Sequence, residues 1–343
     1  MKKLRLVLTA LALAAALCAC TQSHSAPSSS NPEEPLQLDA IRLELSQFAA
    51  KETLLSVMGS LPDQLKSALA EQGVVAKTVE VTVGDSPAAT AQALEEGTVD
   101  LAIFSGDAFL EAGGSALPML TARVLSPEID SADAADWQNV ELGWSGTDGG
   151  GTRFLIVSGP SDYGRQLSAR AASDTPLTWD ELNRANWVVG QETGNMAQVW
   201  LADHYEGNTF SDLAHLTRSD SSGDDGQLLL SALADGSADI AVIPADARID
   251  FANHWKAGLN RPGGIFQETT VLGVTEKYYD TILAVRPDDE LLTGESFRTA
   301  LAAALAKICS QNSAAAVAMQ GVCSVPVSDS ALDGMRRLIT LGG

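Results

Sequence analysis

Apolar and polar positions along the chain follow two different periods. Residues 41–45 are apolar at every second position, which favours a strand, and residues 79–83 indicate a second one. Between them, residues 54–71 carry apolar side chains at closer to helical spacing, and Gly73 follows as a stop signal. Strands and helices in this order predict an α/β fold in which helices cover the strands.

The alternation continues toward the C-terminus. The sequence predicts helices over residues 88–96, 227–234 and 296–308, and strands over residues 99–104, 187–189 and 240–243. Thr178 and Glu181 have the spacing of a capping box, which predicts a helix start. The glycines at 149–151 predict a turn rather than a phosphate loop, because no Lys-Ser/Thr pair follows them.

Two stretches of the chain repeat each other. Residues 93–108 (ALEEGTVDLAIFSGDA) and 232–247 (ALADGSADIAVIPADA) each contain a helix end, a glycine stop, an apolar strand led by aspartate, and a polar loop. The repetition predicts two similar lobes; chance similarity between two common turns is the alternative. Because α/β sheets bind ligands outside the carboxyl ends of their strands, the loops at 105–107 and 244–246 would flank a cleft.

The first 19 residues have the pattern of a signal peptide. A basic start at residues 2–5 precedes an apolar run of twelve residues, 6–17, whereas a membrane span needs about 20. The run ends in Leu17-Cys18-Ala19-Cys20, which resembles the lipobox of bacterial lipoproteins. This resemblance implies that Cys20 carries the lipid and anchors the protein to the extracytoplasmic face of the cell membrane. The alternative is an ordinary signal peptide cleaved near Ala19, with Cys20 unmodified.

Composition and charge limit the classes of partner and activity that the protein can have. The chain has 343 residues, enough for two domains, and a net charge of −22, which repels nucleic acid and anionic membrane surfaces. An anionic ligand stays possible, because backbone N–H groups bind anions whatever the global charge. The four histidines do not have the spacing of a zinc site, so the sequence predicts no bound metal or other cofactor. It also lacks the Gly-x-Ser-x-Gly motif of serine hydrolases, so it does not favour an enzyme.

Four stretches occur in an order typical of one family. They are EEGTVDLAIFSGDAF (95–109), PLTWDELNRANWVVGQETGNM (176–196), LADGSADIAVIPADA (233–247) and YYDTILAVRPDDEL (278–291). In these stretches the chain resembles the phosphate/phosphite/phosphonate-binding proteins of ABC transporters, which have the periplasmic-binding-protein type II fold. The resemblance implies a monomer that binds a small oxyanion between two lobes and presents it to an importer permease. The alternatives are another small solute, such as a sulfonate or a phosphorylated vitamin precursor, a ligand-sensing subunit of a membrane receptor, and an extracellular enzyme.

The expected organisation follows from this resemblance. Residues 1–19 would be the signal peptide, and the Ser/Pro-rich residues 20–35 a disordered tether. Residues 36–152 and 282–343 would form a discontinuous lobe I, and residues 153–281 lobe II. Two strands, near residues 153–159 and 280–287, would cross between the lobes, which would close around the ligand by hinge motion.

Candidate ligand residues follow from the resemblance and from loop position. The family's Ser-Thr-Ser-Gly ligand loop, which holds an oxyanion at a helix N-terminus, falls on Glu192, Thr193, Gly194 and Asn195. Thr193 matches this loop, whereas Glu192 replaces a serine. The Glu192 carboxylate would repel a dianion unless it accepts a hydrogen bond from a protonated ligand oxygen or pairs with a ligand amine. The alternative is that Glu192 faces solvent as an acidic residue in the first turn of the helix. Loop position and aromatic character add Ser105, Gly106, Asp107, Asp246 and, as a pocket wall, Phe48.

Two cysteines near the C-terminus predict a disulfide bond. If Cys20 carries lipid, Cys309 and Cys323 remain as an even pair in an oxidising compartment. A disulfide would close a loop of 13 intervening residues and stabilise the fold by ~3 kcal/mol on the chain-entropy account. Two buried free thiols are the alternative.

Overall fold

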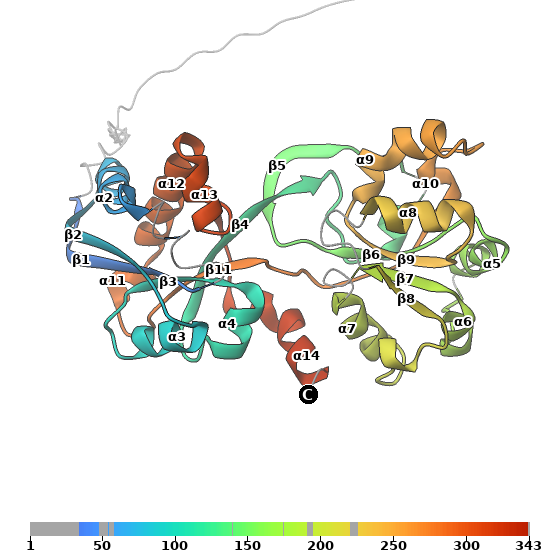
Figure 1. Ribbon diagram of the computed structural model, residues 1–343, viewed down its shortest axis with the longest axis horizontal. Coiled ribbons are helices and arrows are strands. Elements are labelled where there is room, and N and C mark those ends of the chain that lie inside the picture. Colours follow the sequence, from blue (N-terminus) through green and yellow to red (C-terminus); the bar gives the residue numbers. More distant parts are fainter. Residues whose placement is uncertain are drawn as a thin grey trace, which may run out of the picture. The chain divides into compact units, whose positions relative to one another are not determined.

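Two β-sheets organise the computed structural model, which describes residues 34–47, 54, 58–138, 140–173, 175–190, 195–219 and 226–341 (Figure 1). In these ranges one sheet has the order β12-β4-β11-β3-β1-β2, with β5 paired to β4, and the other has the order β10-β6-β9-β7-β8. Lobe I here denotes the first sheet with the helices that pack on it, and lobe II denotes the second sheet with its helices. This is the two-lobed α/β architecture of type II periplasmic binding proteins.

The strands of lobe I come from both ends of the described chain. They are β1 (Leu36–Leu45), β2 (Val74–Val83), β3 (Leu101–Ser105), β4 (Leu117–Pro127), β5 (Trp144–Gly150), β11 (Thr281–Val285) and β12 (Cys323–Pro326). Its helices are α2 (Leu61–Glu71), α3 (Pro87–Glu95), α4 (Gly106–Ala112), α11 (Glu290–Thr293), α12 (Glu295–Gln311) and α13 (Ser313–Ala318). β1 is parallel to β2 and β3, whereas β11 runs antiparallel to β3 and β4.

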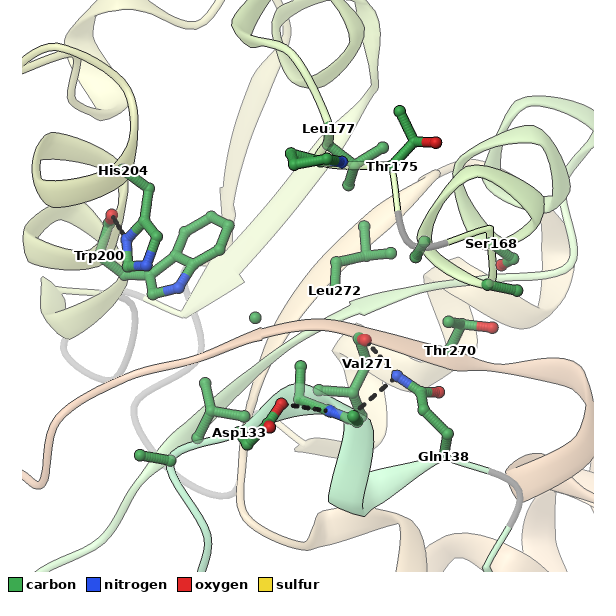
Figure 2. Close-up of a pocket in the computed structure, with 18 of the residues that line it drawn as sticks. Asp133, Gln138, Ser168, Thr175, Leu177, Trp200, His204, Thr270, Val271 and Leu272 are labelled. Carbon is green, nitrogen blue, oxygen red and sulfur yellow. Dashed lines mark hydrogen bonds between the residues drawn. The ribbon is translucent and has the colours of Figure 1, made fainter.

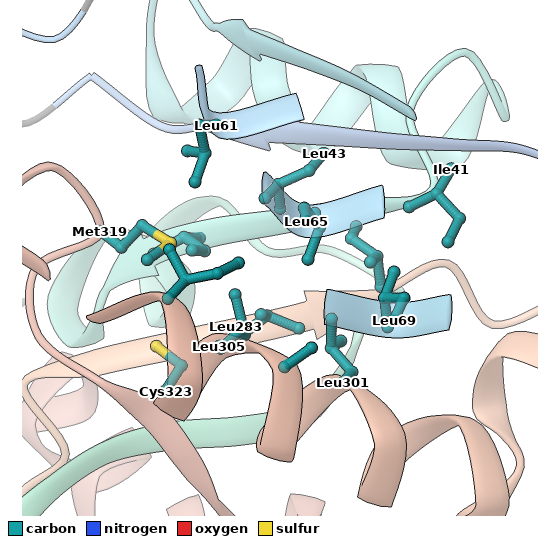
Figure 3. Packing of buried hydrophobic residues seen from close by; sticks show 14 of the residues in the cluster. Ile41, Leu43, Leu61, Leu65, Leu69, Leu283, Leu301, Leu305, Met319 and Cys323 are labelled. Carbon is teal, nitrogen blue, oxygen red and sulfur yellow. The ribbon is translucent and has the colours of Figure 1, made fainter. Parts of the chain in front are cut away.

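Leucines at four-residue spacing explain how α2 packs on lobe I. Leu61, Leu65 and Leu69 repeat about once per turn, so they share one face of the helix, and all three are fully buried. Figure 3 shows this face together with Leu301 and Leu305 of α12, in one apolar cluster. The part of this core that α2 supplies therefore follows from helical periodicity.

Lobe II has the same layering around a smaller sheet. Its strands are β6 (Phe154–Ser158), β7 (Trp187–Gly190), β8 (Leu216–Ser219), β9 (Ile240–Pro244) and β10 (Thr270–Val274). Its helices are α5 (Asp162–Ala171), α6 (Trp179–Arg184), α7 (Asn195–His204), α8 (Gly226–Asp235), α9 (Ala247–Asn253) and α10 (Ile265–Glu268). The capping box predicted at Thr178 and Glu181 is confirmed at the start of α6.

The repeated sequence builds the same joint in both lobes. Asp100 leads into β3 beside Arg42 of the parallel strand β1: Arg42 N–H donates to the Asp100 carboxylate (2.8 Å), and Asp100 N–H donates to Arg42 O (2.9 Å). Asp239 leads into β9 beside Asn186, and the corresponding distances are both 2.8 Å. The predicted repeat is therefore a real structural repeat in which each aspartate fastens two parallel strands.

Two connections between the lobes run side by side. Residues 151–153 lead from β5 to β6, and residues 275–280 lead from β10 to β11. Thr152 and Tyr278 exchange both backbone hydrogen bonds, each 2.8 Å long, as an antiparallel bridge. Two crossing segments are thus present and hydrogen-bonded to each other, but they precede the predicted positions: residues 153–159 largely form β6 of lobe II, and residues 280–287 contain β11 of lobe I.

Between β4 and β5 the chain also packs against lobe II, which the sequence did not predict. In residues 129–142, here named the excursion, Trp137 of a short 3-10 helix (Ala134–Trp137) is fully buried in the apolar core of lobe II. The chain then returns as β5, in which Gly149 and Gly150 pair with Val124 and Arg123 of β4. The turn predicted over 149–151 is therefore wrong for the first two glycines. They suit the close strand approach, since a Cβ at Gly149 would lie 2.2 Å from Ser126 Oγ.

The last helix, α14 (Asp333–Leu341), contacts elements of both lobes. A 3-10 turn (Asp329–Leu332) precedes it, and Leu332 and Met335 are fully buried in an apolar cluster that also contains residues of α4 and α7. Further short turns lie at Phe210–Asp212 and His254–Gly258. Among the described helices, none is both long and apolar enough to cross a membrane.

Candidate functional site

The predicted ligand residues that the structure describes lie at or follow the carboxyl ends of β3, β7 and β9, as expected for an α/β fold. Ser105, Gly106, Asp107, Asn195 and Asp246 belong to the described residues. Phe48, Glu192, Thr193, Gly194 and Cys20 lie outside them.

The start of α4 is held by backbone contacts with the second interlobe connection. Gly106 N–H donates to Asp280 O (2.8 Å), and a Cβ at Gly106 would lie only 2.0 Å from Tyr279 O. Ser105 Oγ accepts from Ala108 N–H at 3.4 Å as the helix N-cap. Gly106 is thus required by close backbone packing, and its N–H is already used by the protein.

Asp107 is exposed and meets a residue that the sequence analysis missed. The hydroxyl of Tyr278, on the second connection, donates to Asp107 Oδ1 at 3.0 Å. Tyr278 begins the stretch YYDTILAVRPDDEL, so the signal was present, but only as a family resemblance. This contact brings a carboxylate and a hydroxyl together at the carboxyl end of β3.

Asp246 has a different environment. Its carboxylate is fully buried and accepts hydrogen bonds from Arg248 Nη2 (2.8 Å) and Nε (3.0 Å), and from Arg248 N–H (2.9 Å) as the N-cap of α9. Arg248 is 1% exposed and stacks over Phe266, with 4.8 Å between Cζ and the ring centroid. A buried guanidinium requires a partner, and Asp246 supplies it, so this carboxylate faces the core of lobe II.

Asn195 is the first residue of α7 and is half-buried. Met196 and Ala197, which follow it, are buried in the apolar cluster that includes Met335 of α14. α7 has ten residues, so its first N–H groups and its dipole favour an anion at this end.

Near the crossing of the connections, a cavity of about 590 Å³ is lined by cations and carboxylates. Its lining residues include Arg153, Lys277 and Arg337 together with Asp203, Glu276 and Asp333. Arg337 pairs with Asp203, and both Arg153 and Lys277 pair with Asp130 of the excursion. Burial pushes the pKa of Asp130 up, but Lys277 and Arg153 outweigh it and hold that pKa below its ordinary value.

A second cavity, of about 1010 Å³, lies on lobe II along β10 (Figure 2). Trp200 and His204 stack on one side of it, with 4.8 Å between ring centroids, while Gln138 lies on the other. Beside them, burial and the charge of Glu181 raise the pKa of Tyr205 to about 12. Of the predicted ligand residues that the structure describes, none lines this cavity, named here the groove along β10. The described residues hold no group of three or more His, Cys, Asp or Glu side chains that could bind a metal.

The predicted disulfide is absent from the structure. Cys309 and Cys323 are free, buried thiols in the core of lobe I (Figure 3). Burial raises the pKa of Cys309 to about 11, and burial together with the neighbouring Cys309 raises that of Cys323 to about 12. The alternative of two buried thiols therefore describes this structure.

The comparison with family models identifies the class of protein. The model of one family, described as "ABC transporter, phosphonate, periplasmic substrate-binding protein", matches residues 48–332. No curated protein matches the chain.

Solved structures overlap with most of the chain at low identity. A Xanthomonas citri protein bound to ATP has 13% identity and a TM-score of 0.40, with 88% of this chain and 95% of that chain covered. A binding protein component of an ABC phosphonate transporter from Pseudomonas aeruginosa has 13% identity and a TM-score of 0.36, with 88% and 86% covered. PhnD1 from Prochlorococcus marinus in complex with methylphosphonate has 12% identity and a TM-score of 0.36, with 88% and 97% covered. With TM-scores below 0.5, these overlaps add no argument about the ligand.

Proposed function

Because the chain belongs to the family of periplasmic substrate-binding proteins of ABC phosphonate transporters, we propose that it binds a phosphorus oxyanion between its lobes. Proteins of this family are the substrate-binding components of transporters and not enzymes, so a small ligand and a permease are the partners. The match over residues 48–332 is the observation that carries the proposal, since it includes both connections and every strand of the two sheets except β1. The proposed ligands are phosphate, phosphite and phosphonates.

The proposed anion site lies at the start of α7, with Thr193, Gly194 and Asn195 as its donors. The first turn of the ten-residue helix presents backbone N–H groups and the positive end of the helix dipole, which supports this choice. From lobe I, the hydroxyl of Ser105 is the proposed donor, whereas Gly106 N–H is taken by Asp280 O. Asp107, with its exposed carboxylate, is a proposed neighbour that would favour a singly charged or amine-bearing ligand over a dianion.

The test is a thermal-shift panel on the full chain with phosphate, phosphite, methylphosphonate, 2-aminoethylphosphonate, sulfate and taurine. At one hundred times Kd, a ligand stabilises the fold by about 2.7 kcal/mol, which raises the Tm by roughly 5–10 °C. Thr193→Ala and Asn195→Ala should remove most of the rise given by the bound oxyanion. Thr175→Ala should keep it, because Thr175 lies on the groove along β10.

Each alternative has its own outcome in this panel. A shift from sulfate or taurine alone would make the chain a sulfonate or sulfate binder with the same fold. If Thr175→Ala abolished the rise in Tm, the ligand would bind in the groove along β10 and not at the start of α7. A flat response to all six solutes would refute the proposed ligand class and leave a vitamin precursor or a sensing role to be tested.

We propose that Cys20 anchors the protein to the extracytoplasmic side of the membrane. The motif Leu17-Cys18-Ala19-Cys20 supports this, as does a family whose members act beside a membrane importer. Cys20→Ala should release the protein from the membrane fraction or leave the signal peptide uncleaved, whereas Cys18→Ala should change neither. Detergent-dependent membrane association of a cleaved Cys20→Ala protein would contradict the anchor.

A further inference from the structure

The excursion joins the β4–β5 ribbon of lobe I to the core of lobe II. Glu128 and Gly143 close its base, because Glu128 N–H donates to Gly143 O (3.0 Å) and Gly143 N–H donates to the Glu128 carboxylate (3.1 Å). Within it, Trp137 O accepts from Arg248 Nη2 at 3.4 Å, and the Trp137 indole is fully buried. The excursion is thus held at its base in one lobe and at its tip in the other.

Asp130, near the base of the excursion, contacts both interlobe connections. One carboxylate oxygen lies 2.9 Å from Arg153 Nε, on the connection that leads to β6. The other lies 2.6 Å from Lys277 Nζ, on the connection that leads to β11. One carboxylate therefore bridges two cations that belong to the two separate passages of the chain between lobes.

Both cations are also fastened to backbone oxygens nearby. Arg153 Nη1 donates to Thr275 O (2.9 Å), which links the connection at 151–153 to the connection at 275–280. Lys277 Nζ donates to Gly150 O (3.2 Å), which links the connection at 275–280 to the end of β5. The mutual hydrogen bonds of Thr152 and Tyr278 lie next to these contacts in the sequence.

We propose that Asp130 is a positioning residue that holds the two interlobe connections together and thereby controls how readily the lobes move relative to each other. Hinge motion requires a few connecting residues to change φ and ψ, and a bridge between those residues opposes such changes. Asp130 is 41% exposed while Arg153 is 14% and Lys277 21% exposed, so water and salt screen the bridge and its effect is moderate.

Amide hydrogen exchange of the ligand-free full chain tests this directly. Asp130→Asn should speed exchange at Thr152 and Tyr278 by about 2- to 20-fold, because two partly exposed ion pairs are lost next to these amides. Asp130→Glu should restore slow exchange. Asp148→Asn is the matched control: its side chain is also 41% exposed, and its ion pair with Arg123 lies within the β4–β5 ribbon.

Two further measurements separate positioning from general stability. In 1 M NaCl the wild-type protein should exchange at these two amides almost as fast as Asp130→Asn, since the bridge is screened. The Tm of Asp130→Asn should differ little from that of Asp148→Asn. Wild-type exchange rates at residues 152 and 278 in Asp130→Asn would overturn the proposal.

A ligand measurement extends the inference and rests on the proposed function. Calorimetry with methylphosphonate should give a Kd for Asp130→Asn that differs from wild type by about 2- to 10-fold, with Asp148→Asn unchanged. An unchanged Kd in Asp130→Asn would contradict a role in lobe movement. If wild-type protein binds no methylphosphonate, the proposed ligand fails, while the exchange experiment still decides the role of Asp130.

Discussion

Residues 93–108 of lobe I and residues 232–247 of lobe II carry the same pattern and begin with the same joint. Asp100 and Asp239 each lead a strand and fasten it to the parallel strand beside it. Beyond the strands the two copies diverge: Asp107 is exposed and accepts from Tyr278, whereas Asp246 is fully buried with Arg248. Identical residues in a repeat thus share a role in the framework but not in the loops.

The residue that ends each strand explains this divergence. In lobe I the strand ends at Ser105, whose hydroxyl caps α4 at once, so Asp107 lies within the first turn. In lobe II the matching position is Pro244, which has no side-chain acceptor. The cap is therefore Asp246, two residues later, and its carboxylate turns to the helix it caps. The Ser-to-Pro difference, together with Arg248 at the position of Phe109, gives the same aspartate a different role.

The largest expected effect compares the two loop aspartates. Asp246→Ala leaves Arg248 buried without its counter-ion and should lower the free energy of unfolding by about 3–5 kcal/mol. Asp107→Ala removes an exposed carboxylate and should cost less than about 0.5 kcal/mol. Urea unfolding of both variants measures the difference. Adding Arg248→Met to Asp246→Ala should recover part of the loss, and equal effects of the two single variants would refute the contrast.

The cysteines provide a second contrast between the lobes. Cys309 and Cys323 both lie in lobe I, and lobe II has no cysteine among its described residues. If oxidation joins Cys309 and Cys323, the non-reduced protein should be more stable by ~3 kcal/mol than the reduced one. Unfolding with and without dithiothreitol measures this, and a Cys309→Ser/Cys323→Ser variant should respond to neither condition. Two alkylatable thiols in protein purified from its native host without reductant would leave the pair reduced, as in this structure.

The strand-leading aspartates should differ less, because both carry the same backbone role. Asp100 also binds the guanidinium groups of Arg42 (2.7 Å) and Arg286 (3.2 Å), whereas Asp239 binds the neutral side chains of Ser161 (2.5 Å) and Asn186 (3.0 Å). We expect a loss of about 2–3 kcal/mol for Asp100→Ala and about 1–2 kcal/mol for Asp239→Ala. The reverse order in denaturant unfolding would show that the charged partners add nothing.

Periodicity and glycine stops were sufficient to predict most of the framework. The strands at β1, β3, β7 and β9 and the long α12 lie where the sequence placed them, because burial on one or both faces imposes a regular pattern. The excursion and the partner of Asp246 were not predictable in this way. Trp137 and Arg248 are far apart in sequence, and what buries them is a tertiary contact that leaves no local period.

The ligand residues were the hardest part of the protein to predict from the sequence. Loop position located Ser105 and Asp107 at the carboxyl end of β3, but it could not reveal that Asp280 O occupies Gly106 N–H. Nor could it separate Asp107 from Asp246, whose environments depend on the helix cap. The roles of Thr193 and Asn195 stay predictions that the ligand panel must test.

The smallest expected effect concerns acid stability, in which lobe II should respond more than lobe I. In lobe II, burial pushes the pKa of Glu268 up, but hydrogen bonds from Arg261 (3.0 Å) and Trp255 (2.8 Å) outweigh it and hold the pKa below the ordinary 4.5. In lobe I, Lys77 lowers the pKa of Asp39, yet both side chains are largely exposed, at 78% and 88%. Screening by water leaves that second pair little influence on folding.

A folded-state pKa below the unfolded one stabilises the protein above the unfolded pKa, and this stabilisation is lost as pH falls through the folded value. Stability should therefore decline as pH drops below about 4.5, and Glu268→Gln should flatten the decline because Gln does not titrate. Asp39→Asn should leave the decline as it is in the wild type. Urea unfolding between pH 3 and 6 measures all three proteins. If Asp39→Asn flattened the decline as much as Glu268→Gln, the exposed pair of lobe I would matter as much as the hydrogen-bonded carboxylate of lobe II.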